Sequence, residues 1–400
     1  MINDKLVEQP KRISVYTIQI IFFFIASICV GIGIYEIIPL NHVLGQSFHV
    51  NQQQVVLIGS TFSLGYAVGF LIFGYLANYI ETKKLLTVGL LLLMVSTFVT
   101  GFATTYTLMM ILRTIQGIFA ASFAPLGFSI IIKIFPDNKR VAGISAVTTG
   151  FVMAGILGQL YGSLVISLYP WANVFWLQSL IYAVIIILMV FLVPKTGKAS
   201  TKTTKTNFSA QLAKLLINKS LLPCYIITVT LLFSFVGMYT VMGVFFQKSF
   251  GFDSQKILWI RGIGIIGMIG SMIFVKLSSK LGIVNILSLG LICASISVLI
   301  IGISNHVILS IVMSIIFVFG ITVSLPMIVS LIGVRAGKQG GNAMTLYTFV
   351  LFIGATIGPI ICNHIMDTSG SYSLTFIFLA IVLGISFFVS LMARRTYKIS

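Results

Sequence analysis

The amino-acid sequence predicts an all-α integral membrane protein with twelve transmembrane helices in two pseudo-symmetric six-helix bundles. Composition is the first reason: of the 400 residues, 58% are hydrophobic and 8% are charged, and the mean hydropathy is +1.11. A soluble domain carries about a quarter charged residues, so the composition excludes a soluble enzyme, a disordered chain and a disulfide scaffold. The other two reasons are twelve apolar runs and the repetition of their pattern in two halves of the chain.

The spans follow from the lengths of these runs. A helix needs about 20 apolar residues to cross the hydrocarbon core of a bilayer. The twelve runs that satisfy this requirement cover residues 14–40, 55–77, 85–103, 106–132, 141–167, 172–193, 221–247, 257–276, 282–303, 307–334, 342–365 and 372–392. No small-residue cleavage site closes the first run, so we interpret it as a retained span and not as a signal peptide.

The basic residues predict the orientation of the spans. Of the 25 Lys and Arg residues, 21 fall on one side of the predicted membrane, whereas the other side holds only Lys248 and Lys256. The positive-inside rule therefore places both termini in the cytoplasm. The net charge of +18 is dispersed over seven membrane-flanking segments, and this dispersal argues against binding of nucleic acid.

The largest polar interruption divides the chain into two halves of six spans. Its first part is a Lys/Thr/Ser-rich stretch suited to a flexible linker, and the apolar spacing over 208–217 predicts a short amphipathic helix at the membrane surface. The predicted organisation is a cytoplasmic tail (1–13), a six-helix bundle (14–194), a linker with its short helix (195–220), a second six-helix bundle (221–393) and a cytoplasmic tail (394–400).

The two halves echo each other at a spacing of about 200 residues. Gly158-Gln159 precedes Gly358-Pro359 by 200 residues, and Pro125 precedes Pro326 by 201. Internal repeats of this kind are typical of secondary transporters, which bind substrate between two bundles near the middle of the membrane.

The sequence contains no motif for nucleotide hydrolysis, for other hydrolase activity or for metal binding. There is no G-x-x-x-x-G-K-[ST] phosphate loop, no hydrolase pattern and no His/Cys/carboxylate cluster with the spacing of a metal site. The four cysteines lie far apart inside apolar runs, where we expect small buried side chains. We therefore predict no enzyme activity, no cofactor and no metal, and transport driven by a stored ion gradient remains.

Three stretches carry a family resemblance. Residues 74–84 are similar to the loop motif G-x-L-a-D-r-x-G-r-[RK], with Asn78 and Glu81 in place of an Asp and a Gly. Residues 112–121 are similar to R-x-x-q-G-x-g-a-a, and residues 150–163 to g…G-x-x-x-G-P-x-x-G-G with Gln159 in place of Pro. On these motifs the chain resembles the major facilitator superfamily and, more narrowly, its twelve-span drug:proton antiporter branch.

The resemblance implies the major facilitator fold and efflux coupled to protons. It also implies a charged gate at the loop motif, and glycine and proline in later spans predict bent or flexible gate elements. The predicted gating residues are Gly74, Asn78, Glu81, Lys83, Lys84, Gly158, Gln159 and Pro359.

Glu36 is the only acidic residue well inside a predicted span. An ionised carboxylate in hydrocarbon costs several kcal/mol, so such a residue normally faces a cavity or a partner, and burial favours its protonated form. Arg113 lies at a similar depth in span four, and Gln116 is one turn further along. We predict that Glu36 and Arg113 carry proton coupling. The alternatives are that Glu36 reaches outward to the membrane surface and that Arg113 only braces two spans.

Arg261 lies about five residues into span eight and has no obvious carboxylate partner in the sequence. If it faces a central cavity, the excess of positive charge favours an anionic or zwitterionic substrate; the alternative is that its side chain extends to the membrane surface. The predicted substrate-binding residues are Glu36, Arg113, Gln116, Arg261, Tyr35 and Tyr239.

The predicted function is export of a small organic molecule across the cell membrane by proton antiport and alternating access. The partners are the substrate, protons and the lipid bilayer, and the protein is expected to act as a monomer. One alternative is a dedicated exporter of an endogenous anionic or zwitterionic metabolite such as a siderophore-type metallophore. An importer, a lipid flippase and a non-transporting receptor are weaker alternatives. Ile-, Lys- and Asn-rich usage is typical of an AT-rich bacterium.

Overall fold

The computed structural model describes residues 15–77, 79–196, 208–275, 277–304 and 306–397, and regular structure within these ranges is helical throughout. The elements are α1 (Val15–Tyr35), η1 (Ile38–Leu40), α2 (Asn41–Phe48), α3 (Gln52–Leu76), α4 (Thr82–Thr100), α5 (Tyr106–Ala120), α6 (Phe123–Ile134), α7 (Asp137–Leu168), α8 (Ala172–Leu192), α9 (Phe208–Leu216), α10 (Leu222–Phe250), α11 (Ser254–Val275), α12 (Ser278–Leu281), α13 (Ile283–Ile303), α14 (Val307–Ala336), η2 (Gly337–Gln339), α15 (Gly340–Ser369) and α16 (Tyr372–Tyr397). The predicted tail 1–13, part of the linker and Asn78 lie outside the described residues.

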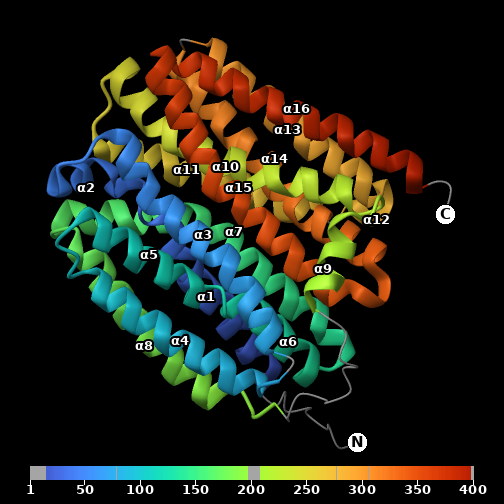
Figure 1. Cartoon of the computed structure of the whole chain (residues 1–400). Helices are drawn as coiled ribbons and strands as arrows, with labels where there is room; N and C mark the ends of the chain where they lie inside the picture. The colour runs from blue at the N-terminus through green and yellow to red at the C-terminus, as the bar shows by residue number, and fades with distance from the viewer. Residues whose placement is uncertain (1–14, 78, 197–207, 276, 305, 398–400) are drawn as a thin grey trace, which may run out of the picture.

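The long helices confirm the predicted fold class. In the described ranges, eleven stretches are long and apolar enough to cross a membrane. α11 is a further helix of 22 residues, and it lies where the eighth span is predicted. The molecule is thus an all-α, multi-pass membrane protein (Figure 1).

Two of the predicted spans are interrupted, and proline explains both breaks. α1 ends at Tyr35, and a turn of 3-10 helix leads into α2. Pro39 lacks an N–H and its ring clashes with the carbonyl four residues earlier, which belongs to Tyr35. Span four breaks between α5 and α6 at Ala121, four residues before Pro125. By contrast, α14 and α15 continue through Pro326 and Pro359.

The same three helix pairs occur in each half of the chain. α1 packs on α7 as α10 packs on α15, α3 on α5 as α11 on α14, and α4 on α8 as α13 on α16. A Cβ on Gly158 would lie 2.9 Å from the carbonyl oxygen of Ile32, and a Cβ on Gly358 would meet the carbonyl oxygen of Phe233. These matched close approaches, offset by 200 and 201 residues, give each half the same backbone-to-backbone packing.

The two bundles meet through α3 against α15 and α7 against α11. We call the end of the molecule that carries α9 and α12 the linker face, and the opposite end the α2 face (Figure 1). Near the linker face, a Cβ on Gly74 of α3 would lie 3.0 Å from Cγ2 of Thr345 in α15. Deeper along the same pair, the rings of Tyr66 and Phe352 stack with 4.2 Å between their centroids. The bundles are therefore closed against each other on the linker side.

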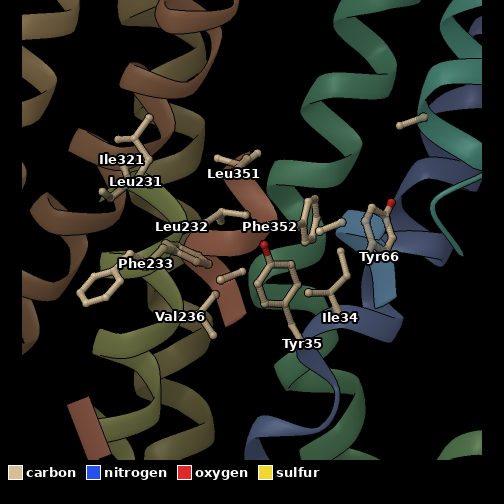
Figure 2. Close-up of a cluster of buried hydrophobic side chains, with 14 of the residues drawn as sticks. Ile34, Tyr35, Tyr66, Leu231, Leu232, Phe233, Val236, Ile321, Leu351 and Phe352 are labelled. Carbon is tan, nitrogen blue, oxygen red and sulfur yellow. The ribbon is translucent and has the colours of Figure 1, made fainter. Parts of the chain in front are cut away.

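Apolar side chains fill the interface at mid-depth. Figure 2 shows Tyr35 and Tyr66 from the first bundle facing Val236 and Phe352 from the second, all of them buried. This layer separates the linker face from the half of the interface that lies toward α2.

Candidate functional site

The break after α1 positions Glu36. Its backbone N–H still donates to the carbonyl of Ile32 at 3.0 Å, but the chain leaves the α-helix at this point. The side chain of Glu36 is fully buried. Its neighbours Ile37 and Ile38 line a cavity between the bundles. The carboxylate therefore enters the interior of the first bundle, while the residues that follow it form a cavity wall.

Arg113 of α5 is the partner of this carboxylate. Its Nη1 lies 3.4 Å from Oε1 of Glu36, and both side chains are completely buried. Nη1 also donates to Oε1 of Gln116 at 2.8 Å, and Nη2 donates to the carbonyl of Gly33 at 2.9 Å. The guanidinium carbon lies 4.3 Å from the ring centroid of Phe62. Charge-assisted N–H···O bonds are usually about 2.7–2.9 Å, so Arg113 is held mainly by its uncharged acceptors and the ion pair is loose.

Gln116 extends this contact to a third helix. Its Nε2 donates to Oγ1 of Thr97 in α4 at 2.9 Å, and Thr97 donates to the carbonyl of Leu93 at 2.7 Å. The network thus joins α1, α5 and α4 inside the first bundle. A change in the charge of Glu36 would therefore alter contacts that involve all three helices.

The buried pair is incompletely satisfied. Among the described residues, Oε2 of Glu36 and Nε of Arg113 have no hydrogen-bond partner. The hydroxyl of the nearby Tyr161 does not complete the pair, because it donates a hydrogen bond to the carbonyl oxygen of Val174 at 2.6 Å. Removing two charges from water costs free energy unless hydrogen bonds satisfy both groups. The pair therefore contributes little to the stability of the fold, and Glu36 is a candidate for a group that binds and releases a proton.

The cavity beside Glu36 contains uncharged side chains only. It is a small cavity that lies between the bundles toward the α2 face. The first bundle contributes Ile34, Ile37, Ile38, Asn41, Val56, Gly59, Ser60 and Ser63, and the second contributes Val236, Thr240, Ala355 and Pro359. The hydroxyl of Ser60 is buried and has no hydrogen-bond partner within the described ranges. A polar group of a bound molecule would satisfy it.

Arg261 lies in the second bundle, away from Glu36. Its side chain is 5% exposed, and no hydrogen bond or ion pair joins it to any described residue. Its electrostatic neighbour is Tyr239 of α10. A Cβ on Gly243 would lie 2.7 Å from Nη2 of Arg261, so the guanidinium occupies space that the glycine leaves open.

Tyr35 and Tyr239 both contact the ring of Phe235 at the interface between the bundles. Phe235 lies 5.9 Å from Tyr35 and 5.1 Å from Tyr239, measured between ring centroids. In Figure 2 the hydroxyl of Tyr35 points into the interface toward Phe352. The predicted substrate-binding residues therefore form two groups: Glu36, Arg113 and Gln116 inside the first bundle, and Tyr35, Tyr239 and Arg261 along the interface.

The predicted gating residues near the linker face make specific contacts. Nζ of Lys83 donates to the carbonyls of Val190 and Val193 at the end of α8, and its backbone N–H donates to Thr196 at 3.1 Å. A cation at a helix C-terminus is favourable. Glu81 is the N-cap residue of α4 but its side chain makes no capping hydrogen bond, and Lys84 is exposed.

The other predicted gating residues lie along the interface helices. Gly158 contacts the backbone of α1, as described above, and Pro359 lines the cavity. Gln159 is fully buried; its Nε2 donates to the carbonyl of Gly155 at 2.7 Å and its Oε1 has no partner.

Sequence reasoning missed part of the site. The Gly33 carbonyl became available because α1 ends two residues later, and Thr97 is one of many hydroxyl residues in the spans. Ser60 had a signal in the sequence: it precedes Arg261 by 201 residues, and the two halves repeat at about 200 residues.

Two matched bundles, a buried ion pair and a cavity between the bundles define the class of polytopic secondary transporters. The sequence matches the Major Facilitator Superfamily over residues 23–359, and the chain belongs to this family.

Solved structures agree with this assignment at the level of the fold. One is a bacterial homologue of the human lysosomal transporter Spinster in an inward-facing, unoccupied conformation, with 14% sequence identity and a TM-score of 0.76; the match covers 97% of this chain and 98% of that one. The same homologue in an inward-facing, occupied conformation gives 13% identity and a TM-score of 0.74, with 96% and 98% covered. These likenesses show the fold, and membership of the family makes the chain a secondary transporter.

Proposed function

We propose that the protein exports a small organic molecule from the cell in exchange for protons, by alternating access. The buried, incompletely satisfied pair of Glu36 and Arg113 is the observation that carries this proposal. Protons are the coupling ion, and no cofactor is required.

Glu36 is the proton site in this proposal. When its carboxylate is ionised, it pairs with Arg113 and holds α1 against α5. When it is protonated, the attraction is lost, and Arg113 keeps only Gln116 and the Gly33 carbonyl as acceptors. Because Glu36 lies in the break before η1, this change is passed directly to Ile37 and Ile38 in the cavity wall. Proton binding and cavity shape are thereby linked.

The substrate occupies the interface and not the ion pair. Tyr35, Tyr239 and the cavity residues are available from both bundles, whereas Gln116 is already engaged by Arg113 and Thr97. The bundles 14–194 and 221–393 rock about this interface. The linker face is the cytoplasmic face, and a single chain forms the complete pathway.

The linker face acts as one gate. Lys83 ties the start of α4 to the end of α8, and Gly74 lets α3 approach Thr345 of α15. Separation of α3 from α15 would open this face, and the cavity toward α2 would then close.

Reconstituted vesicles test the proposal. Vesicles that contain the internal pH dye pyranine would be given a pH gradient together with ethidium or 4-phenylbutyrate as trial substrates. The wild type should move at least one of them against its gradient while protons move in the opposite direction. Glu36→Gln should reduce this movement to the level of protein-free vesicles.

The control is Asp367→Asn, which removes an exposed carboxylate near the α2 face and should leave coupling unchanged. Full pH-driven transport by Glu36→Gln would show that Glu36 is not the proton site. Absence of proton movement with every trial substrate would contradict proton antiport.

A second candidate, a dedicated exporter of an anionic metabolite, is favoured by one observation: the buried guanidinium of Arg261 without an acid.

A further inference from the structure

The second bundle contains a buried positive charge, on Arg261, that no described acidic side chain neutralises. The described acidic side chains are Glu36, Glu81, Asp253 and Asp367, and none of them contacts Arg261. Nε of Arg261 has no hydrogen-bond partner in the part of the chain that the structure describes. A buried charge without a counter-charge is unfavourable, so its presence points to an anion that binds during the transport cycle.

Arg113 does not share this property. Its guanidinium is occupied by Glu36, Gln116 and the Gly33 carbonyl. The two buried arginines therefore differ in function: one belongs to an internal pair, and the other is free to meet a ligand.

The surroundings of Arg261 place it beside the cavity. Val236 and Thr240 of α10 line the cavity, and Tyr239 and Gly243 face Arg261 three residues further along the same helix. Positions three apart on an α-helix differ by about 60° around its axis, so the two sets occupy adjoining faces of α10.

The pseudo-symmetry of the fold supports the same location. Arg261 follows the cavity residues Gly59 and Ser60 by 202 and 201 residues, close to the offset of about 200 residues between the two halves, and the Ser60 hydroxyl has no partner among the described residues. The second half therefore has a cation at about the position where the first half has uncharged residues that line the cavity.

We propose that Arg261, together with Tyr239, is the anion-binding contact of the substrate site and that the substrate is an amphipathic organic anion. A guanidinium offers a planar fork of N–H donors to a carboxylate or related oxyanion. The apolar body of the molecule would pack against Phe235 and Ile156. The ring of Phe235 contacts that of Tyr239. Ile156 and the Tyr239 hydroxyl both lie next to Gly264, at 2.7 Å and 2.9 Å from the position that a Cβ on this glycine would take. This inference rests on the proposed export function and specifies its substrate class.

Binding without a proton gradient tests the inference separately from coupling. The full-length protein in phosphatidylcholine nanodiscs would be titrated with 4-phenylbutyrate, the uncharged 4-phenylbutyramide and the cation 4-phenylbutylamine, and affinity would be read from thermal unfolding midpoints. The wild type should bind the carboxylate about 10- to 100-fold more tightly than the amide, as expected for a charge-assisted hydrogen bond.

Arg261→Gln should abolish this preference for the carboxylate, and Arg261→Lys should retain part of it. Arg261→Met fills the same space without a charge and serves if the Gln variant does not fold. Lys256→Gln is the matched control, because it removes an exposed positive charge from the same helix, and its preference should equal that of the wild type.

Equal binding of carboxylate and amide by the wild type, or an unchanged preference in both neutral Arg261 variants, would overturn the inference. Nanodiscs that contain phosphatidylglycerol distinguish a lipid source: stabilisation by this lipid through Arg261, without any effect of 4-phenylbutyrate, would assign the site to a headgroup and contradict the substrate proposal. Glu36→Gln should keep the carboxylate preference, so failure of proton coupling and failure of this inference give different results.

Discussion

Glu36 and Arg113 are each completely buried, yet their charged atoms are 3.4 Å apart and each side chain has an atom without a partner. Sequence alone singled out both residues, because charges inside apolar runs are rare and stand out. It could not identify Thr97 or the Gly33 carbonyl as parts of the network. Hydroxyl residues are common in spans, and the carbonyl is free only because of where α1 ends.

Removal of Arg113 should destabilise the protein more than removal of the whole pair. Arg113→Gln leaves the Glu36 carboxylate buried without a counter-charge, and loss of one partner of a buried pair typically costs about 3–5 kcal/mol in the free energy of unfolding. In the double variant Glu36→Gln/Arg113→Gln most of that loss should disappear. Unfolding in detergent at neutral pH measures both.

Lys248→Gln, which changes an exposed positive charge, is the control and should unfold like the wild type. If the effects of the two single substitutions simply add in the double variant, the two charges are not coupled.

Helix packing depends on backbone contacts that only glycine permits. A Cβ on Gly117 of α5 would meet the carbonyl oxygen of Phe62 in α3, whereas the nearest atom to a Cβ on Gly270 of α11 is a ring carbon of Phe319 at 3.6 Å. Both glycines occur in small-residue patterns, so the sequence does not distinguish them. Only the structure separates the position where the backbones touch from the one where a methyl group has room.

Gly117→Ala should therefore be destabilising and Gly270→Ala well tolerated. Extra volume in a close-packed contact typically costs about 1–3 kcal/mol, and at Gly117 the opposing atoms are backbone and cannot rotate away. Thermal unfolding midpoints of the two variants, measured in the same detergent, provide the comparison. A Gly117→Ala variant as stable as Gly270→Ala would mean that α3 and α5 separate easily.

The sequence could predict the helix breaks only in part. Pro39 and Pro125 lie just after interruptions, but Pro326 and Pro359 lie inside continuous helices. Proline weakens a helix at every one of these positions, and the surrounding packing decides whether the helix ends.

At the scale of the whole molecule, the sequence predicted two similar halves, and the matched contacts of Gly158 and Gly358 have a common origin in that repeat. Which face is closed could not be predicted. Alternative states of a transporter differ by only a few kcal/mol, and no local pattern of residues encodes so small a difference.

A disulfide across the closed face should lock the transporter. A Cβ on Gly74 would lie 3.8 Å from the Cβ of Thr345, which is the usual separation in a disulfide. The variant Gly74→Cys/Thr345→Cys should cross-link under mild oxidation, lose transport and recover it after reduction. Each single cysteine variant, treated in the same way, should remain active. A fully cross-linked protein that transports at the normal rate would contradict opening at the linker face.

The most direct test of the central claim follows the linker face as pH changes and needs no substrate. Nitroxide labels at the exposed positions 84 and 280, one in each bundle, report the distance between the bundles by double electron–electron resonance in a background without native cysteines. In the wild type, low pH should protonate Glu36, weaken its pair with Arg113 and increase the population with long distances, while high pH should favour the closed face. Glu36→Gln imitates the protonated acid and should give the long-distance population at every pH. A Glu36→Gln variant with the same pH dependence as the wild type would contradict the assignment of Glu36 as the proton site.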